Sequence, residues 1–154
     1  MNLYTLRFKC VGFLIFGGKK KSNIDELHSI PVTDVGHLTD DGLLATLYSA
    51  ADVFVLPSII DNLPQTMIEA LSCGTPSVGF NIGGVPDMIE HKGNGYLVEP
   101  FEVKDLANGI EWILCNSEEK CLGRRARLKA ERENANGLIG RKYRQLYENI
   151  LNPG

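Results

Sequence analysis

The chain has 154 residues, of which 44% are hydrophobic and 23% charged, as is usual for one globular domain. The formal net charge of -3 gives no electrostatic case for binding nucleic acid or an anionic membrane. The apolar runs at 11–16 and 53–56 are far shorter than the roughly 18 to 20 residues of a membrane helix. Because residues 1–10 also lack the apolar segment of a signal peptide, we expect a cytoplasmic protein.

The four cysteines, Cys10, Cys73, Cys115 and Cys121, form no C-x-x-C pair, and the three histidines are scattered. Zinc sites are typically built from closely spaced pairs of such residues. The sequence therefore predicts small, buried or half-buried thiols in a reducing cytosol and no metal site.

Apolar strands and amphipathic helices alternate along the first part of the chain. Residues 11–16 form a short apolar run that predicts a strand buried on both faces, and residues 31–36 are a second strand candidate. Thr39, Asp40 and Asp41 can cap a helix whose apolar stripe ends at Tyr48. Residues 52–57 give the clearest strand, because they are β-branched and aromatic and end in proline.

The same alternation continues to the end of the chain. Proline in the first turn and glycine after the last turn predict a helix from Pro64 to Gly74. Further strands are expected over 76–80 and 96–98, and further helices over 85–91, 103–115, 118–132 and 138–151. Such alternation predicts a single α/β domain over residues 1–154, with a doubly wound, Rossmann-like parallel sheet and helices on both faces. Ligands of such folds bind in the crevice at the carboxyl ends of the strands.

The most informative stretch is a loop and a helix start that directly follow the clearest strand. Free N–H groups and the helix dipole at such a start suit a diphosphate. Asn62 and Pro64 lie where the chain turns into the helix, and Asp61 lies on the loop, near where a sugar would hang from the phosphate. Glu69 lies about one and a half turns into the helix, where a carboxylate can accept two hydrogen bonds from a ribose diol.

Asp61 and Glu69 resemble the acid, seven residues, acid motif of retaining GT-B glycosyltransferases of the group 1, or family four, type. In that family the second acid opens the run E-A-x-x-x-G-T-P, which here spans 69–76. The family more often has Glu first, although some bacterial polysaccharide-type members resemble this chain with D-N-L-P. Residues 48–58, 83–89 and 93–98 resemble the family's preceding strand, its G-G-x-P-E/D-x-I loop and its x-N-G-x-L-V strand.

The resemblance implies a donor-binding site. Glu69 would bind the ribose hydroxyls, and Asp61 would contact the transferred sugar or orient the donor, so these two acids are the catalytic candidates. Backbone amides near the helix start would hold phosphate, and residues 36–38 would border the base. The implied donor-binding residues are Asn62, Leu63, Pro64, Gln65, Glu69, Gly36, His37, Leu38, Gly83 and Gly84, although Pro64 has no N–H to offer. No metal or other cofactor is implied, because the nucleoside-diphosphate sugar is a substrate.

Structural interpretations of the same residues stay open. Asp61 could be a plain turn residue, and Glu69 could lie on a solvated helix face. Gly83-Gly84 could form only a turn, and His37 could be an ordinary loop residue. Lys19 to Lys21 could bind phosphate or form a solvated loop.

A complete GT-B enzyme has two such domains, with the active site between them. The resemblance implies that the N-terminal acceptor domain is absent here, as is the first strand of the donor domain with the Arg and Lys that stabilise the leaving diphosphate. Residues 3–8 or an early helix could replace that strand, whereas Lys19 to Lys21 follow the second strand and are not the equivalent of that Arg and Lys. We therefore expect a donor-domain fragment that is inactive alone.

The parent protein is expected to transfer a hexosyl group from a nucleoside-diphosphate sugar to an acceptor. Bacterial polysaccharide or glycolipid synthesis is the implied setting, with a peripheral membrane position of the parent as one arrangement. A non-catalytic nucleotide-binding module and a nucleotide-sugar epimerase of the same architecture are the alternatives. The spacing of Asp61 and Glu69 and the run over 69–76 favour the transferase.

Overall fold

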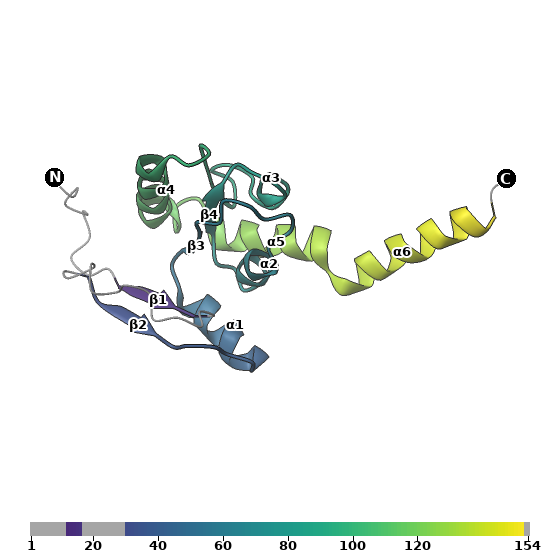
Figure 1. The fold of residues 1–154 in the computed structure, drawn as a ribbon, viewed down its shortest axis with the longest axis horizontal. Coiled ribbons are helices and arrows are strands. Elements are labelled where there is room, and N and C mark those ends of the chain that lie inside the picture. Colours follow the sequence, from purple (N-terminus) through teal and green to yellow (C-terminus); the bar gives the residue numbers. More distant parts are fainter. Residues whose placement is uncertain (1–11, 17–29, 153–154) are drawn as a thin grey trace. The chain divides into compact units, whose positions relative to one another are not determined.

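The computed structural model describes residues 12–16 and 30–152, whose elements are labelled in Figure 1. The chain forms two compact units, residues 1–44 and residues 45–154, and each is described by itself. The proposed replacement strand at 3–8, Cys10 and the lysines at 19–21 lie outside the described residues.

The first unit contains two short parallel strands. β1 (Phe13–Ile15) pairs with β2 (Val32–Asp34), with Phe13 opposite Val32. The predicted strand positions are thus confirmed, but the expectation that the first strand is buried on both faces is wrong. Phe13 and Leu14 are exposed, and β2 is the one strand that pairs with β1 among the described residues.

Helix α1 (Asp41–Ala50) begins where its cap residue predicts. The Asp40 carboxylate accepts a hydrogen bond of 2.8 Å from the Leu43 N–H, which satisfies a backbone donor of the first turn. Of the predicted apolar stripe only Tyr48 is buried, whereas Leu43 is exposed.

The second unit is built on a three-stranded parallel sheet. Its strands β3 (Phe54–Leu56), β4 (Ser77–Phe80) and β5 (Gly95–Val98) lie in the order β3-β4-β5. The parallel α/β architecture is therefore confirmed. The parallel strands of the first unit are described as the pair β1-β2, and those of the second unit as the sheet β3-β4-β5.

Helices cover both faces of the sheet in the second unit (Figure 1). On one face α2 (Gln65–Ser72), α3 (Val85–Met88) and α5 (Leu122–Asn134) pack around buried Met67, Leu71 and Ala126. On the other face α4 (Val103–Asn116) packs Ile113 against Val78 and Val98. Alternation along the strands sends Phe54 and Leu56 to the first core and Val53 to the second.

Close backbone contacts hold α5 against the end of α2. Gly74 follows α2 with φ of 82°, the left-handed conformation expected of a glycine that ends a helix. A Cβ at Gly123 would lie 2.5 Å from the Gly74 carbonyl oxygen, so only glycine allows this approach. Arg127 adds a hydrogen bond of 3.1 Å to the Ser72 carbonyl.

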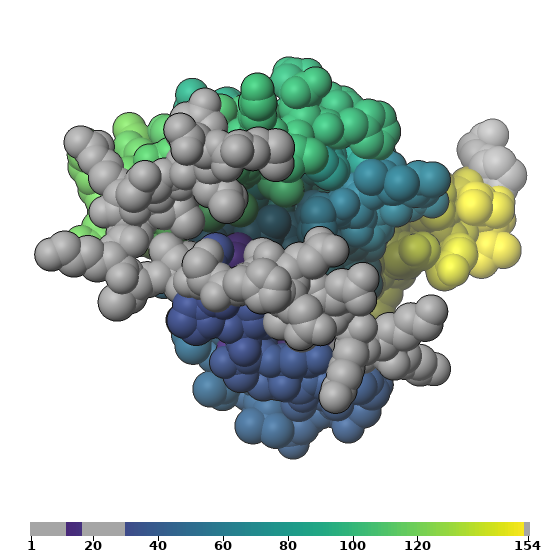
Figure 2. Space-filling view, turned by 60° about the vertical axis from the view of Figure 1, so that its left-hand side comes forward, coloured from purple at the N-terminus to yellow at the C-terminus, as the bar shows by residue number. Residues whose placement is uncertain are grey.

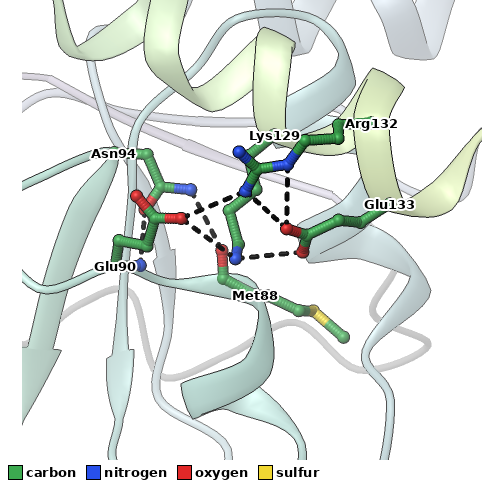
Figure 3. Close-up of polar contacts among 6 residues, drawn as sticks. All are labelled: Met88, Glu90, Asn94, Lys129, Arg132 and Glu133. Atoms are coloured by element: carbon green, nitrogen blue, oxygen red, sulfur yellow. Dashed lines mark hydrogen bonds and ion pairs between the residues drawn. The ribbon is translucent and has the colours of Figure 1, made fainter.

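Two helices differ from their predicted bounds by three residues or more at one end. α3 ends at Met88 rather than 91, because the buried Asn94 side chain accepts a hydrogen bond from the Glu90 N–H and donates one to the Met88 carbonyl (Figure 3). α5 begins at 122 rather than 118, because Cys121 has a left-handed backbone with φ of 51° that interrupts the helical chain.

An ion-pair network joins α5 to the turn after α3 (Figure 3). Lys129 Nζ lies 3.3 Å from Glu90 and 3.0 Å from Glu133, and Arg132 lies 2.6 Å from Glu133. Hydrogen bonds from Arg132 and then Lys129 lower the pKa of Glu133. Because Glu90 and Arg132 are largely exposed, this network stabilises the fold only slightly.

The last helix, α6 (Asn136–Leu151), has no buried residue. It lies at the surface of the second unit, in yellow in Figure 2. Its apolar side chains Tyr143, Leu146, Tyr147 and Ile150 are all exposed. No helix in the described part of the chain is long and apolar enough to cross a membrane.

Candidate functional site

The loop between β3 and α2 leads into a helix whose first turn contains no acidic side chain. Asp61 is half-buried, Asn62 and Leu63 are exposed, and Pro64 is buried at the N-cap. Pro64 makes no side-chain capping hydrogen bond, and the first turn of α2 contains no acidic residue. The positive end of the helix dipole is therefore not offset by a carboxylate from its own first turn.

The Gly83-Gly84 loop lies in backbone contact with this helix start. A Cβ at Gly83 would lie 1.9 Å from the Asp61 carbonyl oxygen, and a Cβ at Gly84 would lie 1.9 Å from that of Asn62. The Gly84 N–H also donates a hydrogen bond of 3.3 Å to the Asp61 carbonyl. Gly83 has φ of 53°, which glycine adopts without strain. The two glycines form a turn, and that turn fixes the position of the loop that carries Asp61.

Glu69 lies on the outer face of α2. It is the fifth residue of the helix and is exposed, whereas Met67, Ala70 and Leu71 are buried in the core. Its carboxylate accepts a hydrogen bond of 2.9 Å from the Tyr48 hydroxyl. The helix face is thus solvated, as the structural interpretation holds, but the carboxylate is also held by a protein donor.

Tyr48 is the residue near this carboxylate that the sequence does not single out. Burial raises the pKa of its hydroxyl, and the hydrogen bond to Glu69 and repulsion by that carboxylate raise it further. The hydroxyl therefore keeps its proton and acts as the donor. In the sequence Tyr48 is recognisable only as an apolar stripe position, because its partner lies 21 residues away.

The structure gathers most of the predicted site residues in the second unit. They lie on two loops in contact and on the helix that leaves one of them: Asp61, Asn62, Leu63, Pro64, Gln65, Glu69, Gly83 and Gly84. The predicted base-side residues lie in the first unit, where Gly36 has φ of 68° and its N–H donates to the Asp34 side chain. His37 is exposed there and Leu38 is half-buried.

Carboxylates and backbone N–H groups are the chemical groups that this region offers. Across residues 12–16 and 30–152, no group of three His, Cys, Asp or Glu side chains could hold a metal ion. Cys73, Cys115 and Cys121 are free; Cys73 is half-buried, as expected, whereas Cys115 and Cys121 are exposed, contrary to the expectation of buried or half-buried thiols. A helix start beside a carboxylate suits a ligand that carries both an anionic group and a diol.

A protein-family comparison matches most of the chain. The family described as "Glycosyl transferases group 1" matches residues 11–133, and this match runs across the boundary between the two compact units.

Relatives with assigned functions are also similar to most of the chain. The chain is 32% identical over 120 residues to sulfoquinovosyl transferase SQD2 of Arabidopsis thaliana. The aligned region covers 75% of this chain and 23% of the relative. It is 28% identical over 109 residues to N-acetyl-alpha-D-glucosaminyl L-malate synthase of Bacillus anthracis, which covers 70% of this chain and 29% of the relative. The chain thus spans less than a third of the length of these relatives.

Solved structures share the fold. Sucrose-phosphate synthase from Thermosynechococcus elongatus superposes with a TM-score of 0.77 and 31% identity, over 90% of this chain and 38% of that one. A glycosyltransferase from Rickettsia africae gives a TM-score of 0.80 at 22% identity, over 94% and 41%. HepE from Anabaena, solved in complex with UDP, gives 0.76 at 22% identity, over 91% and 42%.

Proposed function

The chain belongs to the group 1 glycosyltransferase family and has the fold of the C-terminal half of a GT-B enzyme, and on this premise we propose that it binds a nucleotide-sugar donor. In this proposal Glu69 accepts hydrogen bonds from the ribose hydroxyls. The helix start at 62–65 holds the diphosphate, and Asp61 contacts the transferred sugar or orients the donor. The nucleoside-diphosphate sugar is the substrate, and the proposal includes no metal.

One observation carries this proposal: the backbone of Asp61 and Asn62 is locked against Gly83 and Gly84 at the start of the helix that displays Glu69. A fixed loop keeps amide groups and a carboxylate in one arrangement before the ligand arrives. Preorganised groups of this kind stabilise charge without a reorganisation cost.

The proposal for the whole protein is wider. In this proposal the whole protein transfers a hexosyl group to an acceptor, which a second domain holds in line with the donor. The reaction belongs to polysaccharide or glycolipid synthesis. Residues 36–38 border the base. A cytoplasmic setting and a peripheral membrane position of the parent belong to the same proposal. The 154-residue chain, if it is used alone, binds donor without transferring it.

Calorimetry on the 154-residue chain tests the site. UDP is the first probe, because a protein of the same fold was solved with it, and GDP and ADP follow. Glu69→Gln keeps the size of the side chain but removes its charge, and charge-assisted hydrogen bonds are worth about 1.5 to 3 kcal/mol. We therefore expect affinity for the nucleoside diphosphate to fall roughly ten- to a hundredfold.

Glu148→Gln is the matched control, because Glu148 is an exposed glutamate on α6. It should leave affinity unchanged. Wild-type affinity in Glu69→Gln would remove Glu69 from the site. No heat with any of the three nucleotides at millimolar concentration, on protein that circular dichroism shows to be folded, would refute donor binding by this chain.

A further inference from the structure

The buried Tyr48 side chain donates a hydrogen bond to the solvent-exposed Glu69 carboxylate. Tyr48 is 3% exposed, whereas Glu69, which accepts its hydroxyl hydrogen bond at 2.9 Å, faces solvent. The two residues belong to different helices, α1 and α2. The hydrogen bond therefore fixes a surface side chain by means of a group that belongs to the interior.

A ring contact and a backbone hydrogen bond also fix the position of Tyr48. Its ring packs edge-on against Phe54 of β3, with ring centroids 5.7 Å apart and an interplanar angle of 75°. Its backbone carbonyl accepts a hydrogen bond from the Thr75 hydroxyl at the entry to β4. Because ring and backbone are both anchored, the hydroxyl has little freedom to follow a moving carboxylate, and the carboxylate must instead adopt the position that the hydroxyl sets.

We propose that Tyr48 is a positioning residue, whose hydroxyl holds the Glu69 carboxylate in the orientation that binds a ribose diol. This inference rests on the proposed function, because it assigns a partner to the residue that contacts the ribose. Tyr48 itself does not contact the nucleotide in this proposal.

The hydrogen-bonding capacity of a carboxylate makes this arrangement chemically sound. An ionised carboxylate has about four acceptor positions, so one hydrogen bond from Tyr48 leaves others for two ribose hydroxyls. A free glutamate side chain loses rotamer freedom when a ligand immobilises it. Since Tyr48 has already restricted Glu69, less of that entropy is lost when the ribose binds.

The experiment compares each ribonucleotide with a counterpart that lacks the diol. Calorimetry measures the affinity of the chain for UDP, GDP and ADP and for their 2′,3′-dideoxy forms. Tyr48→Phe keeps the ring that packs on Phe54 and removes only the hydroxyl. We expect the preference for the ribose form to fall about two- to tenfold, the range that one immobilised side chain accounts for. Affinity for the dideoxy forms should not change.

Tyr96→Phe is the matched control. The Tyr96 hydroxyl also donates to a carboxylate, that of Asp105 at 3.1 Å, but its ring belongs to the opposite core, beside α4. The same substitution there should leave the ribose preference intact. A general loosening of the fold would reduce affinity for ribose and dideoxy forms alike, so the ratio separates positioning from structural support.

A double variant shows whether Tyr48 acts through Glu69. In the Glu69→Gln background, Tyr48→Phe should cause no further loss of ribose preference. If Glu69→Gln lowers the ribose preference and Tyr48→Phe does not, the positioning role is refuted while the proposed function stands. If Glu69→Gln leaves the preference unchanged, the proposed function fails, and the positioning role fails with it.

A second variant covers the case in which Tyr48→Phe does not fold. Glu69→Asp keeps the charge but withdraws it by one methylene from the Tyr48 hydroxyl, at an exposed position that carries no core packing. Ribose preference should fall there as well. Full preference in Glu69→Asp would show that the carboxylate does not need to be held by Tyr48, and would overturn the inference.

Discussion

Helices α4 and α6 have similar amphipathic sequences but very different surroundings. In α4 the stripe Leu106, Ile110 and Ile113 packs against β4 and β5, and Ile113 is fully buried. In α6 the corresponding stripe is half-buried at Leu138 and exposed beyond it, with Leu146 51% and Ile150 63% accessible. The period of a sequence therefore predicts a helix and its apolar face, but not whether another element covers that face.

The difference arises from what each helix follows in the chain. α4 comes directly after β5 and turns back over the sheet, where Gly109 lets the Tyr96 ring approach the helix backbone. α6 comes after α5, from which a single residue, Ala135, separates it. It projects away from the sheet and the other helices of the unit instead of returning to the sheet (Figure 1).

The largest expected effect is the loss of a buried side chain from α4. Ile113→Ala should lower the free energy of unfolding by about 2 to 5 kcal/mol, because it removes transfer energy and leaves a cavity. Leu146→Ala removes a comparable side chain from α6 and should cost about 0.5 kcal/mol or less. Urea unfolding followed by the fluorescence of the single tryptophan, Trp112 of α4, measures both. Equal losses would mean that α6 is covered in solution.

The same contrast shows what the sequence could predict. Local rules found the Asp40 cap and the glycine that ends α2, because each depends on residues within one turn. The parallel direction of β3, β4 and β5 also followed from the alternation of strands and helices. The short span of α3 did not follow from the sequence, because the side chain that ends the helix, Asn94, lies six residues after Met88.

The candidate site was predictable as a set of residues rather than as an arrangement. The two acids and the two glycines stand out in the sequence, but the contact of Gly83 and Gly84 with the Asp61 loop is tertiary. The partner of Glu69 was missed because a tyrosine in an apolar stripe has no distinguishing spacing. The order of the three strands in the second unit was also not specified, since strand patterns do not say which strands pair.

A medium effect is expected at Gly109, the buried glycine of α4. In Gly109→Ala the added Cβ would lie 2.7 Å from Tyr96 Cδ1 and 3.2 Å from Val78 Cγ1. Overpacking a core typically costs about 1 to 3 kcal/mol, which exceeds the gain of about 0.5 to 1 kcal/mol from replacing a helical glycine. The variant should therefore be less stable than the wild type in urea. A gain in stability would show that the Tyr96 ring moves aside freely.

The smallest effect, and one of opposite sign, is expected at the glycine of the exposed helix. Gly140 in α6 has no heavy atom within 4 Å of an added Cβ, so Gly140→Ala meets no clash. The substitution should stabilise the helix by about 0.5 to 1 kcal/mol, because alanine loses less backbone entropy than glycine on folding. Since α6 has no buried residue, this gain should appear mainly in thermal melting of the helical circular dichroism signal. Trp112 fluorescence should report a smaller change, because it follows the α4 core. A loss of stability in Gly140→Ala would contradict the contrast between the two helices, since it would require a neighbour packed on the α6 backbone where the described residues place none.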